Sequence, residues 1–363
     1  MNRRLLLSVL LVSACSDAGV NQNGNDLPDG STMDQAGNSG LVPVLVAVGP
    51  KMRTTLSCDG GKTWIANQTA DAAFVCGMCD HDAQSAGSLV FANGWFLATH
   101  GHGTSGPVRR SRDGKTWEDL GTLGWFNGAM YSGGKFVLVT NTPSYSSDDG
   151  VTWNPSNKAL FTLSTGTQPV VRAGISTPSG FVMTADAQGG IAAMTMSTDG
   201  LNWTQKLNYP TECGVSIAAS PTGFATVGTG GKVGQLCGSA DGGTTWSQNF
   251  VGDAVDTVVW NPVAQKYSAF GTTKVFQSSN GVDWVSSPLK QTIEGAPSTN
   301  RPVLGPVAVT PDGNYVSIGS AYQTQYAYRS SDGITWDRQP VGAVVQSHPI
   351  KLITAGMVPS CPQ

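Results

Sequence analysis

The chain has 363 residues, with 46 glycines and 20 prolines, and only 12% of its residues are charged. Its formal net charge of −3 offers no basic face for nucleic acid, so we expect no nucleic-acid partner. Glutamate occurs only as Glu118, Glu212 and Glu294, and lysine is sparse, which argues against long helices. The length is compatible with two or three domains or with one large β architecture.

The first residues, MNRRLLLSVLLVSAC, have the layout of an export signal. Arg3 and Arg4 give a positive start, and an apolar run over 5–12 follows. That run is too short to cross a bilayer, which takes about 20 residues. The end of the segment resembles the lipobox of bacterial lipoproteins, because Ser13 and Ala14 are small residues directly before Cys15.

This resemblance implies that residues 1–14 are a lipoprotein signal peptide and that Cys15 is acylated, giving a lipid anchor to a membrane. A residue other than aspartate after the cysteine, here Ser16, resembles lipoproteins sorted to the outer membrane. We therefore expect an outer-membrane lipoprotein of the bacterial cell envelope, facing either the periplasm or the outside. The alternative is a soluble secreted protein in which Cys15 has no special role.

Residues 15–40 are expected to form the lipidated cysteine and a flexible tether. The stretch after Cys15 is rich in glycine, asparagine, aspartate and serine and almost lacks large apolar side chains. Such a segment cannot bury enough surface to order itself.

Seven stretches of the remaining chain share a serine, an acid or asparagine two positions later, and a glycine three residues before a tryptophan. They are SCDGGKTW from 57, SRDGKTW from 111, SSDDGVTW from 146, STDGLNW from 197, SADGGTTW from 239, SSNGVDW from 278 and SSDGITW from 330. Their tryptophans are 36 to 53 residues apart. A period of about 40 to 50 residues is typical of propellers and solenoids.

Each stretch has the chemistry of a corner between two strands. An aspartate side chain can accept hydrogen bonds from backbone N–H groups just ahead of it, and glycine supplies the positive φ of a tight β connection. The tryptophan begins the next strand, where its indole fits an apolar seam. We therefore predict a structural role for Asp59, Asp113, Asp148, Asp199, Asp241, Asn280 and Asp332. The acid-to-tryptophan offset predicts a longer turn at Asp59, Asp148 and Asp241 than at the other four.

Upstream of each corner, a strand, a turn and a second strand recur, as in GAMYSGGKFVLVTN and VAVTPDGNYVSIGSA. With the strands on either side of the corner, each unit has the four strands of a propeller blade. The first unit lacks its first strand, whereas HPIKLITAGMV (348–358) follows the last corner. The sequence thus predicts an all-β, seven-bladed β-propeller over 41–363, closed by a C-terminal strand that joins the N-terminal blade. We expect a monomer.

The pattern SxDxGxTW resembles the Asp-box, or bacterial neuraminidase repeat, of sialidase-like propellers. In that superfamily the box lies between the third and fourth strands of a blade. The resemblance covers residues 41–363 and implies the fold. It does not select a function, because the box occurs in sialidases, xyloglucanases, sortilin-type receptors and photosystem assembly factors.

Six cysteines besides Cys15 suggest disulfides in an exported chain. With strands numbered from the axis outward, Cys58 lies in the first corner, and Cys361 follows the closing strand at the same end of that blade. Cys213 and Cys237 begin strands one and three of the fifth blade. The strand order therefore predicts three disulfides: Cys58–Cys361, Cys213–Cys237 and, from the two cysteines that are left, Cys76–Cys79.

The loop CGMCDHD (76–82) has two other interpretations. A redox CxxC normally begins a helix in a thioredoxin-like unit, and no such unit is visible. A divalent metal site, for zinc or copper, would combine His81 and Asp82 with His100 and His102, which the strand order brings to the same face of the second blade. The alternative is a disulfide-held loop whose histidines bond nearby backbone groups.

The resemblance to sialidases raises a hydrolase hypothesis. Those enzymes use three arginines, a tyrosine–glutamate pair and an aspartate, and their first arginine lies in an RIP stretch, which this chain lacks. Arg53, Arg172 and Arg301 could approach one face of the ring, where Glu212 and Glu294 are the glutamates. Glycoside hydrolysis needs two carboxyls at a defined separation. A sialidase-like or other glycoside hydrolase is therefore the alternative, and it rests on fold analogy.

The preferred hypothesis is a membrane-tethered, non-enzymatic propeller, either a binding module or a passive assembly scaffold. It would present one loop face to an unidentified protein or glycan. Aromatic and arginine side chains on that face are the candidate contacts, although each aromatic could instead be a packed loop anchor. They are Trp125, Phe126, Tyr145, Arg172, Tyr209, Arg301, Tyr322 and Tyr326.

Overall fold

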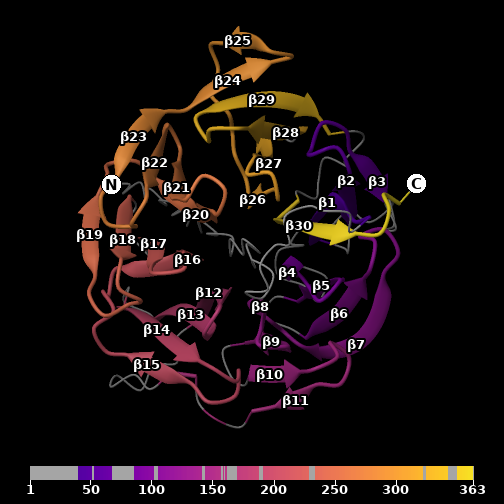
Figure 1. Ribbon diagram of the computed structural model, residues 1–363, viewed down its shortest axis with the longest axis vertical. Helices are drawn as coiled ribbons and strands as arrows, with labels where there is room; N and C mark the ends of the chain where they lie inside the picture. Colours follow the sequence, from indigo (N-terminus) through magenta and orange to yellow (C-terminus); the bar gives the residue numbers. More distant parts are fainter. Residues whose placement is uncertain are drawn as a thin grey trace, which may run out of the picture.

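The protein is a ring of seven β-sheets around a central axis, and each sheet forms one blade (Figure 1). The computed structural model describes residues 40–50, 53–67, 86–101, 105–140, 144–156, 158, 160–161, 170–187, 191–228, 234–321, 324–341 and 350–362. Neighbouring strands within a blade are antiparallel, which confirms the predicted all-β propeller with seven blades of four antiparallel strands. The predicted signal peptide and most of the predicted tether lie outside the described residues.

The strands of each blade are given from the axis outward. Blade 1 consists of β30 (Leu352–Val358), β1 (Val42–Val48), β2 (Thr54–Ser57) and β3 (Ile65–Asn67), and blade 2 of β4 (Ala86–Ala92), β5 (Trp95–His100), β6 (Gly106–Ser111) and β7 (Glu118–Gly124). Blade 3 consists of β8 (Gly128–Ser132), β9 (Lys135–Val139), β10 (Ser144–Ser147) and β11 (Asn154–Pro155), and blade 4 of β12 (Val170–Thr177), β13 (Gly180–Ala187), β14 (Ile191–Ser197) and β15 (Thr204–Lys206). Those of blades 5 to 7 are β16 (Cys213–Ala219), β17 (Phe224–Gly228), β18 (Gln235–Ser239) and β19 (Ser247–Phe250) in blade 5; β20 (Val255–Asn261), β21 (Lys266–Gly271), β22 (Lys274–Ser278) and β23 (Val285–Pro288) in blade 6; β26 (Val307–Val309), β27 (Tyr315–Ala321), β28 (Thr324–Ser330) and β29 (Thr335–Pro340) in blade 7.

The two ends of the propeller meet in blade 1. Strand β30 pairs along its whole length with β1, from Val42 opposite Val358 to Val48 opposite Leu352. A disulfide between Cys58 and Cys361, with Cα atoms 5.8 Å apart, joins the corner of this blade to the segment after β30. Because the bond spans 303 residues of sequence, the chain-entropy model assigns it about 5 kcal/mol of stabilisation.

The second predicted disulfide is also present. Cys213 and Cys237 are buried in blade 5 and link β16 to β18 across β17. Cys76 and Cys79 lie outside the described residues, so their pairing stays a prediction.

Alternating connections divide the molecule into two faces. The turns between strands one and two and the corners between strands three and four lie on one face, which we call the corner face. The connections from strand two to three and from each outer strand to the next blade lie on the opposite face, which we call the loop face. This division follows from the antiparallel order of each blade.

The core lies between the blades. Seven apolar clusters each combine side chains of two adjacent blades. In β1, Val44 and Val46 face blade 2, whereas Leu45 and Ala47 face blade 7. Strands one and two therefore read as continuous apolar runs, because both of their surfaces are covered.

Blade 7 departs from the repeat. A hairpin of β24 (Lys290–Ile293) and β25 (Ala296–Ser298) continues its sheet beyond the outer strand, with β24 parallel to β29. This hairpin protrudes from the rim at the top of Figure 1. The Asp337 carboxylate holds it by accepting hydrogen bonds from the Thr292 hydroxyl at 2.7 Å and the Gly295 N–H at 3.0 Å. The four-strand repeat did not predict these two strands.

The residues that the structure describes form strands and turns without an α-helix. Among them we find no helix with the length and apolar character required to span a membrane.

The corner glycines also set the spacing of the blades. Gly114 has a φ of +78°, and a Cβ there would lie 2.3 Å from Cγ2 of Val46 in blade 1. Gly200 stands in the same relation to Val137 of blade 3, at 2.2 Å. A side chain at these positions would push neighbouring blades apart.

We predict that Gly114→Ala destabilises the protein more than Gly94→Ala does. Gly94, in the same blade, has a similar φ of +74°, and an added Cβ there would have nothing within 4 Å. The Gly94→Ala variant therefore suffers only the backbone strain of a positive φ, without a steric clash. Overpacking against Val46 should add about 1 to 3 kcal/mol. Urea unfolding followed by tryptophan fluorescence measures both variants, and equal losses would show that Gly114 does not limit blade spacing.

Candidate functional site

The seven corners, which are the most conspicuous motif of the sequence, share one hydrogen-bond pattern. In each, a serine hydroxyl donates to the side-chain oxygen Oδ1 of the aspartate or asparagine at 2.8–3.0 Å. The same hydroxyl accepts the glycine N–H at 2.8–2.9 Å. Two further backbone N–H groups donate to that Oδ1, as Lys62 and Thr63 do to Asp59. The serine and the acid or asparagine of each corner therefore stabilise the turn.

The third corner corrects the sequence assignment. Its carboxylate belongs to Asp149, which accepts from Ser147, Val151 and Thr152, and not to Asp148. Asp148 instead points outward and forms an ion pair with Lys135 at 2.5 Å. The doubled serines and aspartates of SSDDGVTW allow two frames, and only the aspartate directly before Gly150 can reach the following N–H groups. The longer turn therefore occurs at Asp59 and Asp241 alone.

The corner tryptophans close the seams between blades. All seven pack against the apolar cluster that their own blade shares with the preceding one. In five corners the indole N–H also donates to the glycine carbonyl, at 3.0–3.3 Å. Within the described part of the chain, the Nε1 atoms of Trp153 and Trp284 are buried without such a bond.

The hydrogen bonds of the corners lower the pKa values of the corner aspartates. For Asp241, the N–H and hydroxyl of Thr245, the Ser239 hydroxyl and the Thr244 N–H lower the pKa from 3.8 to about 2. For Asp199, partial burial acts to raise the pKa, but the bonds from Asn202, Leu201 and Ser197 outweigh it and lower the pKa to about 2. These groups are therefore fixed anions and poor proton donors at neutral pH.

Two of the proposed loop-face contacts are core residues instead. Phe126 is fully buried and lies edge-on to Tyr145 at 5.4 Å between ring centroids. Tyr209 is buried edge-on to Trp246 at 4.9 Å, and its hydroxyl donates to Thr226 at 3.3 Å. Burial raises the pKa of Tyr209 well above its ordinary range. The prediction that Phe126 and Tyr209 contact a partner is wrong, because both rings fill seams between blades.

The other candidates do not form one site. Trp125 and Tyr145 are half-buried around Phe126, and Arg301 is exposed beside blade 7. Tyr326, half-buried in β28, lies under the Arg338 guanidinium at 4.3 Å. Arg172 is the extra residue of a β-bulge in β12. Tyr322 lies outside the described residues.

The hydrolase residues are likewise spread over the ring. Arg53, Arg172 and Arg301 belong to blade 1, blade 4 and the connection into blade 7. Glu294 forms the turn of the β24–β25 hairpin on the outer rim, far from the axis in Figure 1. Because β24 runs parallel to β29, from the corner face toward the loop face, Glu294 lies at the loop-face end of the hairpin but on the outer rim, away from Glu212. Glu212 directly precedes the inner strand β16.

The metal hypothesis is left with one described residue. His100 ends β5 and is buried, whereas His81, Asp82 and His102 lie outside the described residues. Among the described residues, no three histidine, cysteine, aspartate or glutamate side chains group as metal ligands. The zinc or copper site stays a prediction.

Sequence reasoning missed a pair of aspartates where blade 6 begins. Asp253 accepts the N–H groups of Thr273 and Lys274 at 2.8 and 2.9 Å, and bonds of this kind outweigh partial burial and lower its pKa. Asp256 is the bulged residue of β20 and is exposed, but surrounding protein desolvates its carboxyl and, with the charge of Asp253, raises its pKa. The two pKa values are thus shifted in opposite directions.

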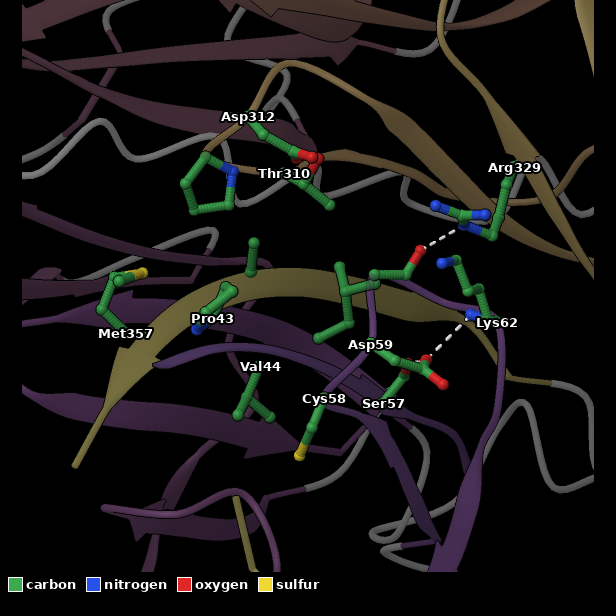
Figure 2. Close-up of a pocket in the computed structure, with 14 residues that line it drawn as sticks. Pro43, Val44, Ser57, Cys58, Asp59, Lys62, Thr310, Asp312, Arg329 and Met357 are labelled. Atoms are coloured by element: carbon green, nitrogen blue, oxygen red, sulfur yellow. Dashed lines mark hydrogen bonds between the residues drawn. The ribbon is translucent and has the colours of Figure 1, made fainter. Parts of the chain in front are cut away.

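Sequence reasoning also missed a cleft on the corner face, between blades 7 and 1 (Figure 2). The cleft has a volume of about 400 Å³. Its polar lining includes Asp59, Lys62, Asp312 and Arg329, and Met357 lies at its apolar end. The whole lining comes from five separate segments, at 43–45, 57–62, 310–312, 329 and 355–357, so no local pattern in the sequence marks it.

We predict that acid destabilises the protein between about pH 4 and pH 2. Above the ordinary aspartate pKa of 3.8, the corner carboxylates are charged in both states and their stabilisation is complete. As the pH falls through the lowered folded-state values, the unfolded chain takes up protons first and this stabilisation is lost. Urea unfolding at pH 7, 4, 3 and 2 measures the loss.

The matched variant is Asp241→Asn, which copies the natural Asn280 corner and removes one titrating carboxylate. Its free energy of unfolding should fall less than that of the wild type between pH 4 and pH 2. A wild-type value that is flat over this range would contradict the prediction.

No protein-family model and no curated protein matches the chain. Solved structures match in fold. A chain of a mitotic checkpoint complex aligns over 94% of this chain and 99% of its own, with 12% identity and a TM-score of 0.50. A structure titled YCF48 bound to D1 peptide aligns over 68% and 77% with 16% identity and a TM-score of 0.48. Apo AztD from Citrobacter koseri aligns over 87% and 98% with 11% identity and a TM-score of 0.46. At a TM-score of 0.50 and 12% identity, the likeness to the checkpoint-complex chain is one of fold alone.

Proposed function

We propose that the protein is an exported, lipid-anchored β-propeller that binds a partner protein or glycan through its loop face without chemical turnover. The observation that carries this proposal is the difference between the two faces. The corner face repeats one turn seven times, with the same serine, acid or amide, and glycine bonds. Among the described loop-face connections between blades, the length varies from 125–127 and 251–254 to 207–212 and 289–306, the last of which contains the β24–β25 hairpin.

Such a division is typical of binding proteins. Loops of unequal length on a rigid scaffold supply the specific contacts, while the scaffold supplies stability. The described part of the loop face also carries exposed apolar groups at the ends of two adjacent outer strands. Leu207, just after β15, is 92% exposed, and Phe250, at the end of β19, is 71% exposed. These two large apolar side chains, exposed on the loop face, favour a protein partner there.

The place of β1 fits an anchor. Val42 begins β1 at the corner face, opposite the end of β30. A tether over 15–40 that ends in an acylated Cys15 would therefore attach at the corner face and leave the loop face turned away from the membrane. The SxDxGxTW corners resemble the Asp-box, and the superfamily that carries this motif includes receptors and assembly factors as well as hydrolases.

A glycoside hydrolase is the second candidate, and the two aspartates of blade 6 favour it. Asp256 has a raised pKa and Asp253 a lowered one, and such a pair can divide the roles of acid and base. Asp253, however, is occupied by three bonds from Thr273 and Lys274. Binding is therefore the preferred function.

We predict that Cys15→Ser abolishes acylation. In cells fed an alkyne-bearing fatty acid, the wild-type protein should carry the label and sediment with membranes, because acyl chains on Cys15 supply the anchor. Ser16→Ala is the control and should stay labelled. Label that persists in Cys15→Ser would refute the anchor.

We also predict that Leu207→Ser combined with Phe250→Ser weakens capture of a partner by about ten-fold or more, since exposed apolar anchors dominate interfaces. Photo-crosslinking in intact cells, followed by purification of the adduct, measures capture. Val285→Ser is the control, because Val285 is 72% exposed but begins β23 on the corner face. Equal capture by all three proteins would contradict a loop-face partner.

An activity assay of the purified protein distinguishes a hydrolase from a binding module. A panel of fluorogenic sialosides and glycosides should give no turnover with a binding module. Product release that is lost in Asp256→Asn would overturn the proposal in favour of glycoside hydrolysis.

A further inference from the structure

The cleft between blades 7 and 1 results from the way the ring closes. Where strands one and two of a blade follow each other in the chain, a turn joins them at the corner face. In blade 1 they are β30 and β1, at opposite ends of the propeller, and no turn connects them. The cleft is lined by the start of β1 at Pro43, the end of β30 at Met357, the corner after β2, and the turn of blade 7 over 310–312.

The acids of the cleft already have partners. Asp59 accepts bonds from Ser57, Lys62 and Thr63 within its own corner. Asp312 accepts the Thr310 hydroxyl and, at 2.6 Å, the side-chain amide of Asn314. These bonds fix both carboxylates in their own turns: Asp59 accepts several donors of its corner, and Asp312 accepts one donor on each oxygen.

The cations of the cleft keep donors to spare. Arg329 is half-buried, and its Nε–H donates to the Gly60 carbonyl, which fixes the guanidinium at the cleft wall. Lys62 is exposed, and its side chain points to the same wall in Figure 2. Across the described residues, neither Lys62 nor Arg329 forms an ion pair within 4 Å, although the charge of Arg329 lowers the pKa of Asp337 on the next strand. Two cations with unused N–H donors beside one cavity suit an anion.

The opposite end of the cleft is apolar. Pro43, Val44, Ala355 and Met357 line it, and Met357 lies across the cavity from Arg329 in Figure 2. A cavity of about 400 Å³ with a cationic wall and an apolar end accommodates a small group of mixed character.

We propose that this cleft binds a carboxylate attached to a compact apolar group, with Lys62 and Arg329 holding the carboxylate and Met357 contacting the apolar part. This chemistry occurs in free acylated amino acids and at the C-terminal end of a polypeptide. The site lies on the corner face, so it is independent of the loop-face partner proposed above, and either proposal can fail without the other.

Titration of the full-length protein with N-acetyl-leucine and with N-acetyl-leucinamide tests the site. The two probes share the apolar group and differ in the carboxylate. With methyl-labelled methionine, the NMR signal of Met357 should shift with the acid and not with the amide, while those of the core residues Met130, Met183 and Met194 stay in place. High salt should weaken the binding, because the attraction is between charges.

Lys62→Gln should weaken binding of N-acetyl-leucine about ten-fold. Lys62 takes part in the fold through its backbone N–H, which the variant keeps. Lys115→Gln, at the equivalent position of the next corner and outside the cleft, is the matched control and should bind as the wild type does.

A decapeptide that ends in a free leucine carboxylate distinguishes the two sources. Tighter binding than that of N-acetyl-leucine identifies a polypeptide end, and equal binding identifies a small acid. The proposal is overturned if Met357 does not respond to the acid, if the amide binds equally well, or if Lys62→Gln binds as the wild type does.

Discussion

The seam between adjacent blades is the contact on which the rest of the structure depends. Strands one and two of a blade expose apolar side chains on both surfaces, so a single blade cannot bury its own core. Val44 and Leu45 of β1, for example, are buried against different neighbours. At each corner, the hydrogen bonds of the serine and of the acid or asparagine position the glycine and direct the tryptophan into the seam, and five of the seven glycines lie against the preceding blade. The polar bonds of the corner and the apolar contact of the seam are therefore one device.

The sequence predicted this device well because it is local. A serine, an acid, a glycine and a tryptophan within seven or eight residues carry all the information for the turn, and their sevenfold repetition fixed the number of blades. Ring closure could be predicted for a different reason: the first repeat lacked a strand and the chain after the last corner had a spare one. Both described disulfides then followed from strand order.

The failures concern features that local patterns do not determine. Asp148 and Asp149 both fit the motif, and only backbone geometry selects the second. Phe126 and Tyr209 belong to connections, but whether such an aromatic points to solvent or into a seam depends on the neighbouring blade. Strand β24 of the added hairpin pairs in parallel with β29, which lies 45 residues later in the chain, a contact that no short-range pattern predicts.

Closure of the ring by two chain ends stabilises the β30–β1 pair and also leaves a gap where a turn would otherwise join the two strands. Full-length pairing and the Cys58–Cys361 bond make this blade resistant to opening, even though its strands come from the two ends of the propeller. The missing turn between the same strands leaves the gap that becomes the cleft. In a chain with only 12% charged residues, most corner charges are consumed by hydrogen bonds within turns. The bond from Arg329 to the Gly60 carbonyl repeats, at this seam, the contacts of Arg110 with Asp149 and of Gln277 with Asp332. Within the described residues, only the further N–H donors of Arg329 and the ammonium group of Lys62 are left beside this gap without a bond that serves the fold. A site that exists only where the repeat is interrupted, between blades 7 and 1, can change without cost to the other five blades.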